Sequence, residues 1–230
     1  MTGPTATFRL GYVPGVTPDK WARTWRERRR EVALELTLAV TDEVVARVRA
    51  GVLDAGLVRL PIDRGGLHAI GLYTETTVVV VPTHHVLTAV EEVRPADLSD
   101  DVVLRPRDDT LPWEGDRPGR VAAADPATTA DAVELVAAGI GLLVLPLSLA
   151  RLHHRRDLTH RPLADAPASR VALTWPDAEN TEDMETFIGV VRGRTVNSTR
   201  TPRREEGSGS SPSSTAAARR RPARRSARRR

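Results

Sequence analysis

Two threonine-bearing turns have the residue types needed to hold a small anion. One spans 12–17 and joins a predicted strand to a predicted helix, and the other spans 125–129 at the start of a later helix. Unpaired backbone N–H groups at a helix start attract negative charge, and the hydroxyls of Thr17, Thr128 and Thr129 could assist. The local pattern alone favours a plainer interpretation, in which these threonines only cap their helices.

Motifs that would support catalysis or metal binding are missing. Gly139-Ile140-Gly141 lies after a helix and before a strand, which reverses the order of a dinucleotide-binding turn. Ser208 lies in a Gly-Ser-Gly stretch with no strand to build a nucleophile elbow. None of the six histidines belongs to an HExxH motif, and the run 153–156 is typical of a solvated surface. We therefore predict a non-enzymatic protein without a metal site or a cofactor.

The composition excludes further classes of protein. The chain has 230 residues, 40% of them hydrophobic, and no cysteine, which rules out disulfides, iron–sulfur clusters and cysteine nucleophiles. No apolar run approaches the ~20 residues that span a bilayer. The first residues lack the layout of a signal peptide. We expect a cytoplasmic protein with no membrane partner.

Positive charge is concentrated at the carboxyl end of the chain. The overall net charge is +4, but residues 200–230 hold eleven arginines and two glutamates, so the other 199 residues are net acidic. This tail has no Leu, Ile, Val or aromatic residue and is predicted to be disordered. It could bind nucleic acid without sequence preference, or it could be a solvated extension. The arginines that would contact phosphates are Arg219, Arg220, Arg221, Arg224, Arg225, Arg228, Arg229 and Arg230.

The body alternates short apolar runs with helical patterns, which predicts an α/β protein with mostly parallel sheet. Strands are predicted at 8–13, 32–38, 54–58, 67–72, 76–81, 101–104, near 121, at 141–145 and at 170–175. Helices are predicted after Thr17-Pro18, from Thr41 to a glycine stop at Gly51, over 128–138, and around 184–191.

Four stretches resemble the effector domains of LysR-type transcription regulators. Residues 48–61 resemble the family's leucine-aspartate-alanine stretch and its following arginine and proline. Residues 72–87 resemble the strand that ends in proline-x-histidine, and 93–98 the aspartate-leucine that follows it. Residues 135–146 resemble the valine-alanine-alanine-glycine-x-glycine signature, which is the most specific of the four.

This resemblance implies a two-lobed type 2 periplasmic-binding-protein fold over residues 8–199, with an effector held between the lobes. Lobe one would hold about 8–82 and 166–199, and lobe two about 83–165, with the tail at 200–230. In the family, helix starts from both lobes face each other across the cleft, which suits a carboxylate. The resemblance therefore implies a site at Tyr12, Val13, Thr17, Thr128 and Thr129. Arg59 could add a charge-assisted contact, or could form an ion pair with an acidic neighbour.

The chain departs from the family because the resemblance begins directly at the effector domain. The winged helix-turn-helix that reads DNA in the family has no counterpart among these residues. We expect a small-molecule-sensing domain that acts in regulation as a homodimer or with a separate DNA-binding protein. The alternative is a nonspecific nucleic-acid binder that uses its tail, with the globular part as a dimerisation module.

Overall fold

The computed structural model describes residues 6–123 and 125–193. The strands are β1 (Ala6–Tyr12), β2 (Val32–Leu38), β3 (Ala55–Leu60), β4 (Leu67–Glu75), β5 (Thr77–Pro82), β6 (Val102–Leu104), β7 (Arg120–Val121), β8 (Leu142–Pro146), β9 (Leu158–Pro162) and β10 (Ser169–Pro176). The α-helices are α1 (Asp19–Arg28), α2 (Thr41–Arg49), α3 (Thr129–Ala137), α4 (Leu147–Leu152) and α5 (Glu182–Val191). The predicted tail, 200–230, and its arginines lie outside the described residues.

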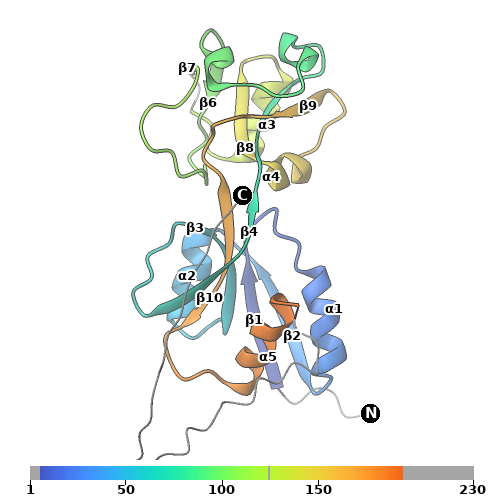
Figure 1. Ribbon diagram of the computed structural model, residues 1–230, viewed down its shortest axis with the longest axis vertical. Coiled ribbons are helices and arrows are strands. Elements are labelled where there is room, and N and C mark those ends of the chain that lie inside the picture. Colours follow the sequence, from blue (N-terminus) through green and yellow to red (C-terminus); the bar gives the residue numbers. More distant parts are fainter. Residues whose placement is uncertain (1–5, 124, 194–230) are drawn as a thin grey trace, which may run out of the picture. The chain divides into compact units, whose positions relative to one another are not determined.

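Lobe one is a five-stranded sheet, β2-β1-β3-β10-β4, with helices on both faces. Alternate residues of β1 serve the two faces. Phe8 stacks with Trp25 of α1 and Phe187 of α5, at ring distances of 4.8 and 5.2 Å. On the other face, Gly11 leaves room for Val44 of α2. Figure 1 shows α1 and α2 on opposite sides of the strands.

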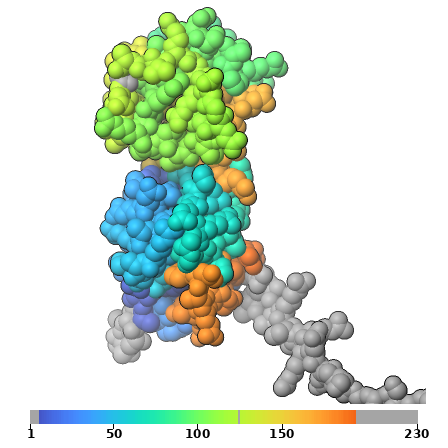
Figure 2. All heavy atoms as spheres, turned by 90° about the vertical axis from the view of Figure 1, so that its left-hand side faces the viewer, coloured from blue at the N-terminus to red at the C-terminus, as the bar shows by residue number. Residues whose placement is uncertain are grey.

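Lobe two is the sheet β7-β6-β8-β5-β9, also covered on both faces. Val78 and Val80 of β5 pack with α3, whereas Val79 and Val81 belong to a cluster with Leu98, which ends a short 3₁₀ helix. A strand that is buried on both faces has apolar residues at successive positions, which explains the four consecutive valines of β5. Figure 2 shows the face on which the β6–β7 connection (light green) covers this lobe and α2 (light blue) covers lobe one.

The chain crosses between the sheets twice. Only Thr76 separates β4 in lobe one from β5 in lobe two, and residues 163–168 lead back from β9 to β10. The two crossings are joined, because the Thr77 hydroxyl donates to the Pro167 carbonyl at 2.6 Å. The sequence-based boundary at 82 differs from this arrangement, since β5 belongs to the second sheet. Pro82 ends β5, but the chain changes lobe earlier, at Thr76, in the polar stretch that precedes the four valines of β5.

The expectation of mostly parallel sheet is wrong. Among the described strands, four neighbouring pairs are parallel and four are antiparallel. The antiparallel pairs all involve β10 or β5, which lie next to the crossings. Strand β10 inserts between β3 and β4 from far along the chain, and local sequence patterns do not reveal such long-range pairing.

Candidate functional site

Backbone contacts fix the shape of the turn after β1. The Val13 N–H donates to the Leu57 carbonyl at 3.1 Å, and the Val13 side chain is 1% exposed in the core. Gly15 follows with a φ of +84°, a value that glycine adopts without strain. The turn then reaches exposed Thr17, two residues before α1 begins. Tyr12 and Thr17 therefore face outward from the turn, whereas Val13 supports it from below.

A cavity of about 660 Å³ lies beside this turn. Lobe one contributes the turn itself, Leu38 of β2 and the end of β4, and lobe two contributes α4. Its lining residues are Tyr12, Pro14, Gly15, Val16, Thr17, Leu38, Tyr73, Thr74, Glu75, Thr76, Leu147, Ser148, Arg151 and Leu152. We call this cavity the cleft. Of the residues predicted from sequence, Tyr12 and Thr17 line it directly.

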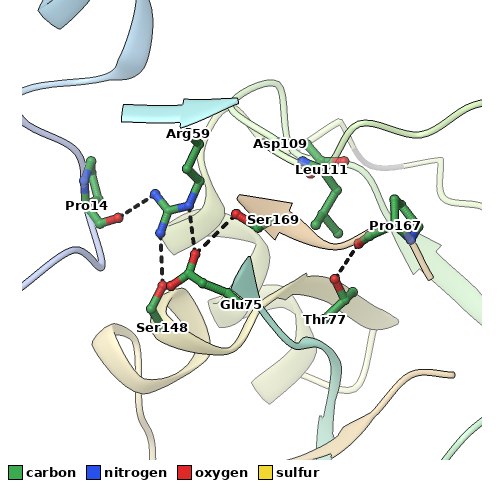
Figure 3. A network of polar contacts seen from close by, with 9 residues as sticks. All are labelled: Pro14, Arg59, Glu75, Thr77, Asp109, Leu111, Ser148, Pro167 and Ser169. Carbon is green, nitrogen blue, oxygen red and sulfur yellow. Dashed lines mark hydrogen bonds and ion pairs between the residues drawn. The ribbon is translucent and has the colours of Figure 1, made fainter. Parts of the chain in front are cut away.

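Arg59 lies behind the cleft and connects both lobes. Its side chain is 3% exposed, and its Nε is 3.2 Å from Glu75 Oε2. The same guanidinium donates to the Pro14 carbonyl at 2.7 Å and to the Ser148 hydroxyl at 2.9 Å. Ser169 Oγ also donates to the Glu75 carboxylate, at 3.2 Å (Figure 3). Of the two roles predicted for Arg59, the structure shows the ion pair with an acidic neighbour.

The charge of the cleft follows from this pairing. Arg59 compensates Glu75, so the carboxylate at the cleft wall does not stand alone. Arg151 of α4 is exposed at the wall and forms no ion pair with any residue in the described part of the chain. Burial, followed by the neighbouring Glu75, raises the pKa of Tyr73, so its hydroxyl stays protonated at neutral pH. Among the described residues, the cleft wall thus combines one unpaired cation, Arg151, with the compensated Glu75 carboxylate and neutral hydroxyl groups.

The two threonines of the 125–129 turn are used elsewhere. Thr128 is the N-cap of α3, accepting from the Asp131 N–H at 3.1 Å while Asp131 accepts from the Thr128 N–H. Thr129 Oγ1 donates to Asp108 at 2.9 Å. Neither residue is among those that line the cleft. The structure therefore does not bring this pair to Tyr12 and Thr17, and the capping interpretation describes Thr128.

The residues that lobe two contributes to the cleft are not among those predicted from the sequence. Ser148 and Arg151 lie on α4, which begins directly where β8 ends at Pro146. A strand end followed by a helix start was available as a signal, because the same signal selected the turn at 12–17. Pro146 by itself predicts only the end of a strand, and a helix as short as α4 has no clear periodic pattern.

Residues 6–123 and 125–193 offer no candidate metal centre and no candidate membrane span. No group of three or more His, Asp or Glu side chains there could hold a metal ion. No helix in this part of the chain is both long and apolar enough to cross a membrane.

Comparison with protein families shows which family the chain belongs to. Residues 2–195 match the model of the LysR substrate binding domain. The chain belongs to the LysR substrate-binding domain family. Among curated relatives, a probable hydrogen peroxide-inducible genes activator of Mycobacterium avium is 27% identical over 211 residues, 86% of this chain and 68% of that protein. The Hca operon transcriptional activator HcaR of Escherichia coli is 25% identical over 206 residues, 83% of this chain and 68% of that protein.

Solved structures of LysR-type effector domains share the architecture. The BenM effector binding domain with its effector benzoate has a TM-score of 0.70 and 22% identity, covering 83% of this chain and 95% of that one. The reduced form of OxyR has a TM-score of 0.68 and 19% identity, covering 85% and 98%. The expected two-lobed fold is therefore confirmed for this LysR-type domain. Its relatives are transcription regulators with effector-binding domains, as the sequence resemblance implied.

Proposed function

We propose that this LysR-type domain senses a small organic anion, bound without chemical conversion in the cleft between its lobes. The observation that carries the proposal is the composition of the cleft wall. Tyr12 and Thr17 come from lobe one, while Ser148 and Arg151 come from lobe two, and both sets line one cavity. A ligand held between them would contact both lobes at once, which a sensor requires.

Electrostatics favours an anion over a cation. Arg151 is an exposed guanidinium without an ion pair among the described residues, and Glu75 is already compensated by Arg59. The start of α1 lies two residues beyond Thr17, so its positive dipole end adds to this field. Arg side chains bind carboxylates through two parallel hydrogen bonds. A small carboxylate therefore matches both the charge of the cleft and its hydroxyl groups.

The cleft also suggests how binding could be transmitted. The Arg59–Ser148 hydrogen bond spans the lobes directly behind the cavity. A ligand that contacts Arg151 and Thr17 would favour one relative position of the lobes, and hinge closure is a common response of such folds. The regulatory output would then depend on a second copy of the chain or on a DNA-binding protein.

Isothermal titration with sodium benzoate as the probe tests the proposal, since benzoate is the effector of the BenM domain. Arg151→Gln should weaken binding about tenfold or more, because a hydrogen bond to a charged group contributes ~1.5–3 kcal/mol. Arg156→Gln is the matched control, because Arg156 is exposed and does not line the cleft. If neither benzoate nor a series of aliphatic mono- and dicarboxylates binds, or if both variants bind equally, the proposal fails.

A further inference from the structure

Lobe two has a second open cavity, of about 510 Å³, beside Thr76 at the crossing from β4 to β5, which we call the hinge. Thr76 and Leu147 line both cavities, and the Leu147 N–H donates to the Thr76 carbonyl at 2.9 Å. The remaining walls come from β5, from the segment 88–91 and from β9. These residues are Val78, Thr88, Ala89, Val90, Glu91, His160, Arg161 and Pro162.

Arg161 is the main polar group of this second cavity. Its Nε donates to the Val90 carbonyl at 2.7 Å, Nη2 to the Thr88 carbonyl at 2.7 Å, and Nη1 to its neighbour's carbonyl at 2.9 Å. These three bonds fix the guanidinium plane but use only three of its five N–H groups. No carboxylate forms an ion pair with Arg161 among the residues that the structure covers. A fixed and uncompensated guanidinium is well prepared to bind an oxyanion.

The lowered pKa of His160 indicates that several positively charged groups lie near this side chain. Burial is the largest cause that lowers the pKa of His160, followed by the charges of Arg151, Arg161 and His154. Glu91 is the acidic residue on the cavity wall, and it is exposed at the edge. The local field is therefore positive, and an anion bound beside Arg161 would relieve the repulsion.

We propose that this cavity is a second binding site, which takes a small organic carboxylate on Arg161. The carboxylate would accept the two remaining N–H groups of the guanidinium, and Val90, Leu147 and Pro162 would contact the apolar body of the ligand. This site is distinct from the cleft, because Arg161 and His160 do not line the cleft, although Thr76 and Leu147 line both cavities.

Binding at this site is coupled to proton uptake. A carboxylate next to His160 stabilises the imidazolium and raises the pKa of that side chain again. Affinity should therefore increase as pH falls from the raised pKa of His160 in the complex towards its lower pKa in the free protein. The carboxylate must remain ionised over the same range, which holds because ordinary carboxyl groups titrate near 4.

NMR titration of the ¹⁵N-labelled chain with sodium benzoate tests the proposal, since amide signals report each cavity separately. The amides of Thr88 and Val90 report the second site, and those of Gly15 and Val16 report the cleft. We expect saturable shifts of the first pair and a raised pKa of the His160 imidazole. No shift of that pair up to about 50 mM benzoate, well above a ~1 mM dissociation constant, would overturn the proposal whatever the cleft does.

Two substitutions on the same short segment supply the control. Ala89 is exposed on the wall of the second cavity, so Ala89→Trp should fill it and remove the Thr88 and Val90 shifts. Val86 is 77% exposed and does not line it, so Val86→Trp should leave those shifts unchanged. Equal loss in both variants, or persistence in Ala89→Trp, would show that benzoate does not bind in this cavity.

Discussion

Arg59 and Glu75 form a buried ion pair across the first residues of β10. Glu75 is the register partner of Ser169, and Arg59 is the partner of Val171, so the two side chains meet over the strand that separates β3 from β4. Their side chains are 3% and 7% exposed. Because the other donors of Arg59 reach Pro14 and Ser148, this pair anchors the turn, the hinge and α4 to one another.

Removing one member of this pair should destabilise the fold strongly. We expect Arg59→Met to lower the free energy of unfolding by about 3–5 kcal/mol, because Glu75 would remain buried without compensation. The double variant with Glu75→Met should recover much of that loss. Urea denaturation measures both. Arg9→Met is the control: its pair with Asp54 is 39% and 31% exposed and should contribute no more than about 1 kcal/mol.

Substitutions at Gly15 and Gly51, which have similar φ values, distinguish the cost of backbone strain from the cost of crowding at the cleft. A Cβ at Gly15 would lie 2.7 Å from Ser148 Oγ and 2.9 Å from Arg59 Nη2, whereas a Cβ at Gly51 would meet nothing within 4 Å. Gly51→Ala should therefore cost only the left-handed strain, about 1–2 kcal/mol. Gly15→Ala should cost more and also weaken probe binding. An equal decrease in the melting temperature of the two variants would mean that the Ser148 and Arg59 side chains move away from the added methyl group at little cost.

Thr128 should contribute to stability and not to ligand affinity. Thr128→Ala removes the N-cap of α3 and its reciprocal contact with Asp131, which should cost about 1 kcal/mol in urea denaturation. Thr41→Ala is the control, because Thr41 opens α2 without capping it. Carboxylate binding in the cleft should be unchanged by Thr128→Ala. A clear loss of affinity in a fully folded Thr128→Ala variant would return this turn to the binding site.

Asp109 should affect stability in the opposite direction to most acidic residues. Burial raises the pKa of Asp109 above 3.8, and this outweighs the lowering by the Leu111 N–H and by Arg117, whose Nη1 is 2.7 Å away. The native state therefore binds this proton more tightly than the unfolded state. As pH falls through the raised value towards 3.8, the wild type should gain stability relative to Asp109→Asn.

Unfolding free energies of both proteins at pH 7, 5 and 4 give the test, since the difference between them isolates Asp109 from the other carboxyl groups. A wild type that loses stability relative to Asp109→Asn on acidification would show that pairing with Arg117 dominates over burial.

Local sequence signals predicted many single elements but not the pairing of strands. The strand at 32–38 and the start of α2 at Thr41 agree with the structure, because hydrophobic pattern and glycine stop act within a few residues. Strand β9 was not predicted. Only Leu158 is buried in it, and at the sheet edge the strand lacks a regular alternation of apolar residues.

The candidate site was predicted on one lobe only. Tyr12 and Thr17 follow from a strand end and a helix start that are adjacent in sequence. Ser148 lies near Tyr12 and Thr17 only in the folded chain. It accepts a hydrogen bond from Arg59, which lies 89 positions earlier in the sequence. Such a juxtaposition depends on how two sheets are connected, which no local pattern encodes.

The insertion of β10 between β3 and β4 constrains how the chain can fold during synthesis. All five strands of lobe two lie between residues 77 and 162, so that lobe is complete while the last strand of lobe one is still to be made. Until then β3 and β4 have no partner between them, and their edges stay open to wrong pairing. Domains made first generally fold first during synthesis. Lobe two, although inserted in the middle of this sequence, should therefore reach its final structure before lobe one.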